Sequence, residues 1–294
     1  MGSLSDVLFA ATALTYVIAS GVYLAFLAGS TKGTSASKLG PWLLGVGVAL
    51  HATHIVVSSL VLHVCPVEGV HFGLSVLSLC ACAAFLGVRI RYRVDAVGAF
   101  VAPLALTFLV ASRFVAATSD ASASMGSAIL PLHVTVNLLG DALFTLAFGA
   151  AVAYLLQERQ LKNKHFTGLF QRLPPLDALD NAEHKFLLAG FPLLTIGILT
   201  GTIWARRVEL GGPADVARAI FGYATWLLIA GVLLMRAAAG WRGRRAAYGT
   251  IAGFGLSVIV LLIYLLRGTP SQVASLDTMS GRDQARSLSV VAHK

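Results

Sequence analysis

The chain has 294 residues, of which 57% are hydrophobic and only 12% are charged, and this composition excludes a water-soluble globular protein because too little charge is available to solvate its surface. The 22 Lys and Arg residues exceed the 13 Asp and Glu residues, but they lie between apolar segments, where they act as topology signals rather than as a nucleic-acid-binding surface. We therefore expect an integral membrane protein that contacts membrane lipid and binds no nucleic acid.

Eight apolar segments are candidates for crossing a membrane. In chain order they are 7–28, 42–62, 72–88, 96–111, 132–156, 186–205, 219–235 and 246–266. Most approach the ~20 residues that a hydrocarbon core of ~30 Å requires, and the short segment 96–111 is expected to be tilted or extended at its ends. The predicted fold is an all-α, polytopic membrane domain over residues 1–267, followed by a Ser-containing tail, 268–294, that we expect to be disordered.

The Lys and Arg residues are distributed unequally between the two sides of this predicted domain. The odd-numbered connections contain fourteen of them, whereas the even-numbered connections and the two termini contain eight. Because cytoplasmic loops accumulate Lys and Arg, both termini are predicted to lie outside. In the longest inside connection, 157–185, Pro174 and Pro175 should prevent a continuous helix, and residues 176–179 could begin a short amphipathic helix at the membrane surface.

Polar side chains inside the apolar segments are the candidate functional residues, because each is costly in hydrocarbon unless it faces a partner or a cavity. His133, Asn137 and Asp141 are spaced by four residues and should lie on one side of the fifth helix. His51 and His54 are three residues apart and should share one face of the second. Such imidazoles could ligate haem iron or another metal, carry a proton, or only hydrogen-bond a neighbouring helix.

Several other chemistries lack a sequence signal. The chain contains no His-Glu-x-x-His zinc motif, no phosphate-binding glycine loop and no plausible Ser-His-Asp set. Cys65, Cys80 and Cys82 are not arranged as a thiol-exchange motif, so we expect them to be structural.

Four stretches follow one another in the second half of the chain: LHVTVNLLGDALFTLAFGAAVAYLLQERQLK, RLPPLDALD, GFPLLTIGILTGTIWA and GWRGRRAAYGTIAGFG. In this order they resemble the cytochrome c assembly transmembrane family, which includes the CcsA proteins of cytochrome c biogenesis and their shorter HemX-like and YpjD-like relatives. The resemblance is strongest over residues 130–265. The eight-helix arrangement with an outside N-terminus, reached above from composition and charge, is similar to the CcsA-type pattern.

The resemblance implies a haem-handling assembly factor, rather than an enzyme, in a bacterial inner membrane. Such proteins present haem at the outer face for attachment to apocytochrome c, together with another maturation subunit. In this family the His that opens the fifth helix is an outer axial haem ligand, which implies that role for His133. The second ligand would then come from His51, His54, His63 or His71.

The chain departs from the family after Trp204. The sequence that follows, ARRVELGGPADVARAIFGYATW, lacks the family's tryptophan-rich loop. Trp204, Arg206 and Arg207 could still contact haem, a partner protein or lipid headgroups. Asn137 and Asp141 are further candidates for contact with haem or a partner. Met235 stands at or near the family's inner His position, but it lies about 16 residues below the outer start of its helix, roughly 24 Å away, so it cannot share an iron with His133. Met235 could still ligate iron apart from His133, as thioethers do in cytochromes, but we interpret it as a core residue.

Two other functions stay open. The chain could be a regulatory or accessory membrane protein of the HemX-like or YpjD-like type that has lost haem transfer and acts through protein contacts. It could also carry a proton or an ion by means of Asp141.

Overall fold

The computed structural model describes residues 2–28, 33–62, 70–91, 95–114, 129–164, 173–207 and 212–266. All regular secondary structure in these ranges is helical: α1 (Gly2–Leu27), α2 (Gly33–Leu62), α3 (Val70–Arg91), the short η1 (Asp95–Val97), α4 (Gly98–Phe114), α5 (Ile129–Lys162), α7 (Leu176–Arg207), α8 (Pro213–Ala239) and α9 (Arg244–Leu266). Eight of these described helices are long and apolar enough to cross a membrane, and they correspond to the eight predicted segments. The predicted all-α, multi-pass membrane fold is confirmed. The tail 268–294 lies outside the described residues.

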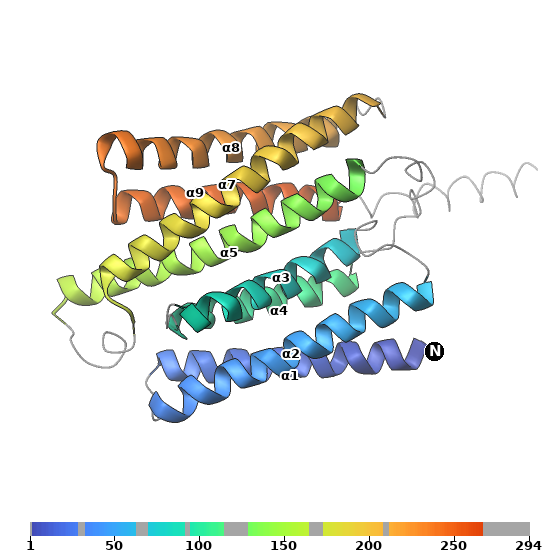
Figure 1. Ribbon diagram of the computed structural model, residues 1–294, viewed down its shortest axis with the longest axis horizontal. Helices are drawn as coiled ribbons and strands as arrows, with labels where there is room; N and C mark the ends of the chain where they lie inside the picture. The colour runs from blue at the N-terminus through green and yellow to red at the C-terminus, as the bar shows by residue number, and fades with distance from the viewer. Residues whose placement is uncertain are drawn as a thin grey trace, which may run out of the picture.

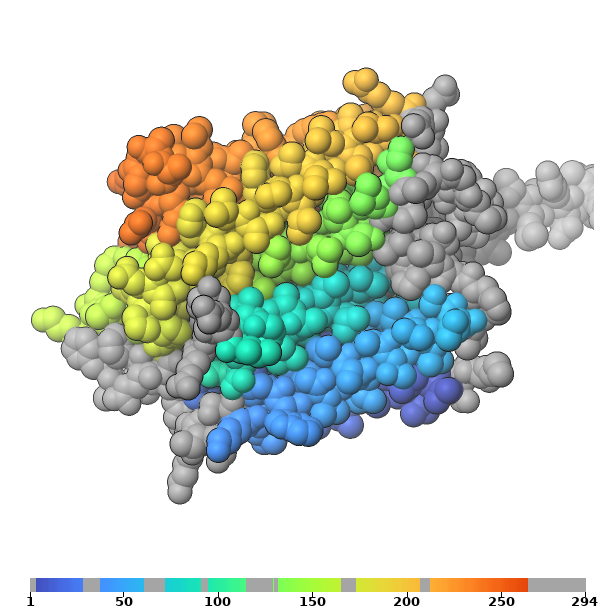
Figure 2. All heavy atoms as spheres, viewed as in Figure 1, coloured from blue at the N-terminus to red at the C-terminus, as the bar shows by residue number. Residues whose placement is uncertain are grey.

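The helices form two groups that follow the order of the chain (Figure 1). Helices α1 to α4 pack together in the first group, α5, α7, α8 and α9 form the second, and α3 packs against α5 where the groups meet. The space-filling view shows α7 running obliquely across one face of the second group (Figure 2). In a membrane the cohesion of such helices comes from close packing and interhelical hydrogen bonds, since lipid is as apolar as their side chains.

The start of α1 and the end of α9 lie at the same end of the molecule (Figure 1). We call it the His133 end, because His133 lies in the first turns of α5 there. The opposite end is called the Asp180 end, because Asp180 lies in the first turns of α7. The location of the start of α1 and the end of α9 at one end of the molecule agrees with an even number of spans. That the His133 end faces outside remains a prediction from the distribution of Lys and Arg.

Close packing in the first group depends on a glycine at the start of α4. Tyr23 and Phe85 are fully buried and meet edge to face, with ring centroids 5.8 Å apart. A Cβ added to Gly98 would lie 2.7 Å from both rings, closer than real Cβ atoms approach. Helix α4 can therefore approach α1 and α3 this closely only because residue 98 has no side chain.

The predicted surface helix at residues 176–179 is not a separate element, and this expectation was wrong. The two prolines do precede a helix start, but Leu176 begins α7, which continues to Arg207. Asp180 and Glu183 in its first turns are buried. Asp180 and the Oε1 atom of Glu183 accept hydrogen bonds from α8 and α9, so neighbouring helices take the place of water at these atoms. The fourth segment is extended at both ends, as predicted, by η1 and by the last turn of α4.

Candidate functional site

His133 lies where α5 packs against the end of α7. Two glycines of α7, Gly197 and Gly201, face this part of α5. A Cβ on Gly201 would lie 2.5 Å from His133 Cε1, and a Cβ on Gly197 would overlap the Asn137 side chain. Small residues four positions apart let two membrane helices approach closely. The GILTG sequence therefore provides the space that the His133 and Asn137 side chains occupy.

The backbone of α7 determines which nitrogen of His133 carries hydrogen. His133 Nδ1 lies 2.8 Å from the carbonyl oxygen of Gly197. Because a carbonyl oxygen can only accept, Nδ1 must donate, and the neutral ring then has its lone pair on Nε2. No hydrogen-bond partner of Nε2 is found among the described residues. Metal-binding histidines usually have this arrangement, with the second ring N–H donated to a carbonyl or a carboxylate.

Two further side chains pack beside the His133 ring and restrict its rotation. Asn137 Nδ2 donates to the His133 backbone oxygen at 2.7 Å and lies 3.1 Å from Nδ1. Thr200 Oγ1 donates to the Ile196 oxygen at 2.7 Å, and it lies 3.0 Å from the Gly197 oxygen and 3.4 Å from Nδ1. With the Gly197 carbonyl and these two groups on one side of the ring, rotation of the imidazole would break the Nδ1 hydrogen bond. The side chain is thus oriented before any ligand arrives.

His51 has a different environment. It is fully buried, with Nδ1 3.2 Å from the Tyr16 hydroxyl and Nε2 2.8 Å from the Ser75 hydroxyl. Both ring nitrogens are therefore engaged, one with α1 and one with α3. In this arrangement His51 joins three helices of the first group and offers no free nitrogen.

His54 lies one turn nearer the His133 end of α2. Its Nδ1 is 3.4 Å from the Ser58 hydroxyl and 3.5 Å from the Ser5 hydroxyl, and its ring meets Phe9 edge to face. Helix α3 lies between α2 and α5 (Figure 1), and no hydrogen bond or ring contact within the described ranges joins His51 or His54 to His133. The structure therefore does not bring the three histidines together. His63 and the side chain of His71 lie outside what the structure describes.

Asp141 is on the same side of α5 as His133 and Asn137, but its side chain is hydrogen-bonded to α9 and not to α7. Ser257 Oγ of α9 donates to Asp141 Oδ1 at 2.6 Å. Eight residues at ~100° each leave a residue turned by roughly 80° from the first, which is enough to direct Asp141 to α9 while His133 faces α7. The predicted polar stripe is thus divided between two helix contacts.

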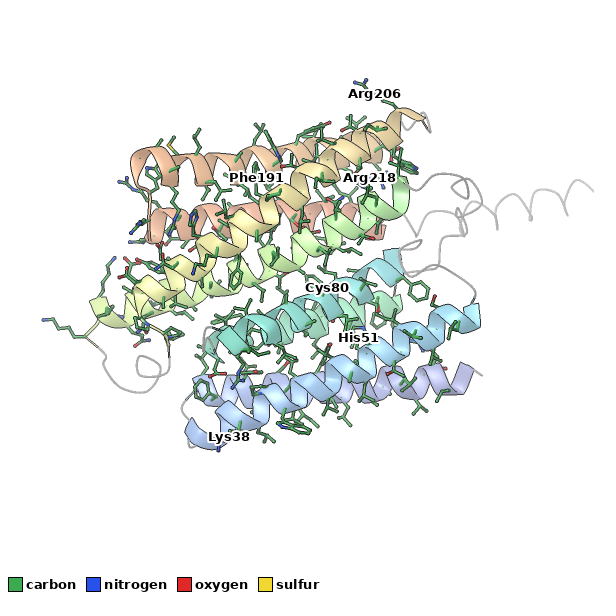
Figure 3. All side chains as sticks on the ribbon, in the orientation of Figure 1. Lys38, His51, Cys80, Phe191, Arg206 and Arg218 are labelled. Atoms are coloured by element: carbon green, nitrogen blue, oxygen red, sulfur yellow. The ribbon has the colours of Figure 1, made fainter. Side chains whose placement is uncertain are left out.

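The remaining candidates lie near helix ends. Trp204 is half-buried in the last turns of α7, and Arg206 is exposed there, directed away from the other helices (Figure 3). The side chain of Arg207 is outside the described residues. Met235 lies near the Asp180 end of α8, where its carbonyl oxygen accepts from the backbone N–H groups of the turn that follows. Met235 and His133 are thus at opposite ends, in agreement with the spacing argument.

Sequence reasoning missed a second polar cluster, at the Asp180 end. Asp180 of α7 pairs with Arg236 of α8, and the two side chains are only 7% and 8% exposed. Asp180 Oδ1 also accepts from the backbone N–H of Gly243 at 2.7 Å, and nearby Glu183 Oε1 accepts from Thr250 at 2.6 Å. The sequence does contain a signal for this cluster. Asp180 and Glu183 follow the Pro174–Pro175 pair and are three residues apart, a spacing that puts them on one face of a helix that begins there.

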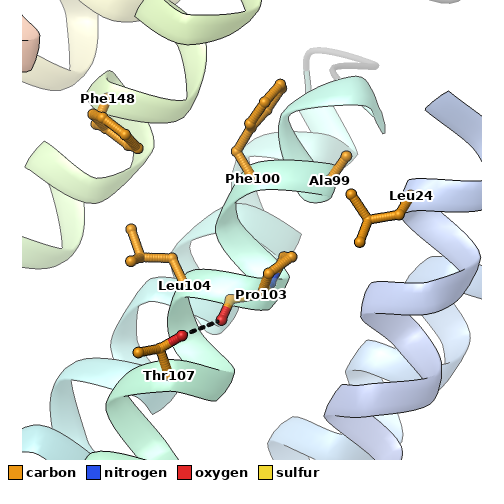
Figure 4. A pocket seen from close by; sticks show the side chains of 7 residues that line it. All are labelled: Leu24, Ala99, Phe100, Pro103, Leu104, Thr107 and Phe148. Atoms are coloured by element: carbon orange, nitrogen blue, oxygen red, sulfur yellow. Dashed lines mark hydrogen bonds between the residues drawn. The ribbon is translucent and has the colours of Figure 1, made fainter. Parts of the chain in front are cut away.

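An apolar groove lies where α1, α4 and α5 meet (Figure 4). Its lining consists of Leu24, Ala99, Phe100, Pro103, Leu104, Thr107 and Phe148. The one hydroxyl there, on Thr107, donates to the Pro103 carbonyl of its own helix at 3.0 Å. With no polar group left to orient a ligand, this groove is not a candidate functional site.

The sequence profile described as Cytochrome C assembly protein matches residues 69–269, more than half of the chain. The matched region includes every described helix from α3 to α9. The chain belongs to the cytochrome c assembly protein family.

Individual relatives support this membership. The chain is 28% identical over 204 residues to a cytochrome c biogenesis protein CcsA from Guillardia theta, covering 62% of this chain and 66% of that protein. It is 34% identical over 133 residues to the CcsA of Crocosphaera subtropica, covering 45% and 37%, and 38% identical over 95 residues to that of Gloeothece citriformis, covering 32% and 28%. The chain thus spans less than two thirds of the length of these relatives.

Proposed function

We propose that this family member binds haem through His133 and assists the maturation of c-type cytochromes in a bacterial inner membrane, with the His133 end facing outside. The haem assignment rests on one observation. The Gly197 carbonyl accepts a hydrogen bond from His133 Nδ1, so Nε2 has a lone pair and no partner among the described residues. The similarity to CcsA proteins supports the connection with cytochrome c biogenesis.

The residues of this chain fit one axial ligand of a haem iron. His133 would supply that ligand, Gly197, Asn137 and Thr200 would hold its ring, and Gly201 would leave the edge of the ring uncrowded. Haem itself supplies the groups that become attached to an apocytochrome, so the work of this chain is binding and orientation. We propose that a partner maturation subunit completes the second axial position and covers the haem, because the chain lacks the tryptophan-rich loop of its relatives.

The haem spectrum of the purified protein tests this function. His133→Ala should abolish the Soret band while the protein stays helical and membrane-inserted, because loss of an iron ligand weakens binding far more than loss of an interhelical hydrogen bond, worth ~0.6 kcal/mol in membranes. His184→Ala, at the Asp180 end, is the matched control and should keep the band. Imidazole added to His133→Gly should restore it. Retention of the band in His133→Ala, or equal loss in both alanine variants, would contradict the proposal.

The regulatory or accessory function is the second proposal, favoured by the absence of tryptophan between Trp204 and Trp226. It predicts no haem in the chain purified alone or in a gentle membrane pull-down. It also predicts intact cytochrome c maturation in a deletion strain. Haem present only together with a co-purifying subunit would support shared binding instead.

A further inference from the structure

A groove of about 290 Å³ lies between α7 and α8 at the His133 end, on the side of α7 that faces away from His133. It is lined by Ile198, Leu199, Thr202, Ile203, Arg206 and Tyr223. Leu199, Ile203 and Tyr223 are 59%, 48% and 43% exposed, so the groove is open to the surroundings of the helices. In a membrane, these surroundings are lipid.

The groove is closed toward the middle of the molecule. There the Phe191 ring stacks on Trp226, with centroids 5.7 Å apart, and Trp226 Nε1 donates to Thr195 at 3.0 Å. Nearer the His133 end, a 2.6 Å hydrogen bond between the Thr202 and Tyr223 hydroxyls joins α7 and α8 across the groove. The groove therefore begins beyond the Phe191–Trp226 contact, on the side nearer the His133 end, and opens toward the membrane boundary.

Polarity changes along the groove. Ile198, Leu199 and Ile203 form an apolar floor. The Thr202–Tyr223 hydroxyl pair lies between Leu199 and Arg206, and Arg206 is at the end of the groove. From Ile198 to Arg206 the helix rises roughly 12 Å. The candidate membrane span also ends at Arg206. The single cation is thus located where hydrocarbon gives way to headgroups.

Arg206 is the charged residue among those that line the groove, and it could bind an anionic ligand. No carboxylate is among the lining residues, and Arg206 forms no ion pair with any described residue. This distinguishes it from Arg218, which is paired with Asp215 of its own helix. A guanidinium at the membrane boundary binds phosphate oxygens through paired N–H donors.

We propose that this groove is a binding site for an anionic phospholipid, independent of haem. One acyl chain lies along Ile198, Leu199 and Ile203, and the phosphate pairs with Arg206. A transmembrane helix of a partner is the less suitable occupant, because it would supply apolar side chains for the floor but no anion for Arg206. An anionic phospholipid supplies an acyl chain and a phosphate in one molecule.

Native mass spectrometry of the full chain, titrated with phosphatidylglycerol or phosphatidylcholine, tests the proposal. The wild type should bind phosphatidylglycerol more tightly than phosphatidylcholine. Arg206→Gln should weaken phosphatidylglycerol binding about fivefold, the usual contribution of one basic residue near a membrane surface, and leave phosphatidylcholine unchanged. Ile203→Trp, which fills the groove, should weaken the binding of both lipids.

Arg242→Gln is the matched control, since Arg242 is an exposed arginine at the Asp180 end, remote from the groove. It should bind both lipids like the wild type, and all variants should keep the wild-type helix content by circular dichroism. Equal affinity of the wild type for the two lipids would overturn the proposal. Unchanged phosphatidylglycerol binding in Arg206→Gln, or an equal loss in Arg242→Gln, would also overturn it, the latter because binding would then depend on net charge alone.

Discussion

Removal of Asp180 should destabilise the protein far more than removal of both Asp180 and Arg236. The two side chains are almost fully buried, and Arg236 donates to both carboxylate oxygens and to the Asp180 backbone oxygen. The carboxylate also accepts from the Gly243 N–H, which places the turn between α8 and α9 against α7. One acid therefore holds three helix ends together.

The expected magnitude follows from what remains after each substitution. Asp180→Ala leaves the Arg236 guanidinium buried without its hydrogen-bonded partner, a change that costs ~3–5 kcal/mol. The unpaired Gly243 N–H adds roughly 1–3 kcal/mol. In Asp180→Leu/Arg236→Met the buried charge is gone and apolar groups of similar size fill the space, so mainly the N–H cost remains. The double variant should therefore be more stable than Asp180→Ala by several kcal/mol.

Unfolding in mixed detergent micelles with rising SDS, followed by circular dichroism, measures both free energies. A loss below ~1 kcal/mol in Asp180→Ala would mean that water reaches the pair and screens it as it does a surface salt bridge. A double variant no more stable than Asp180→Ala would show that the hydrogen bond to Gly243, and not the buried charge, dominates. Either result would refute the reasoning.

Three further predictions concern glycines and topology. Gly201→Val should displace the ring of His133 and weaken the Soret band without unfolding the protein, which haem titration of the detergent-purified variant checks. Gly243→Ala should lower the stability measured in SDS more than Gly240→Ala, because both glycines have left-handed φ angles, 65° and 64°, but only a Cβ at 243 would overlap the Tyr154 hydroxyl. Reporter fusions in the α5–α7 connection should report cytoplasm and those in the α7–α8 connection the exterior; the reverse pattern would contradict the outside location of the His133 end.

The spans could be predicted from the sequence because a membrane imposes one length and one composition on every crossing segment. Even the short segment 96–111 was expected to extend at its ends, and η1 and the last turn of α4 lengthen it. The start of α7 could not be predicted in the same way. Asp180, Glu183 and Lys185 are typical of a loop by composition, and the partners that bury the two acids lie 56 and 67 residues further along the chain.

The candidate site could be predicted only in part. The spacing of His133 and Asn137 indicates that they share a face of α5, and the structure joins them through a hydrogen bond. The sequence does not indicate which helix lies opposite. The GILTG spacing of α7 is typical of a close helix contact but does not show that α5 is the partner. The proton on His133 Nδ1 depends on that pairing, because the Gly197 carbonyl of α7 accepts it.

Helix α7 connects the two polar clusters. Its first turns hold Asp180 against Arg236, and its last turns place Gly197 and Gly201 against α5. A slip of α7 by one residue would move it 1.5 Å along its axis and turn it by ~100°. An isoleucine from position 196 or 198 would then meet Asn137, where only a glycine fits. The glycines therefore fix the register of α7 locally, and the geometry of the His133 ring follows from that register and not from the distant ion pair.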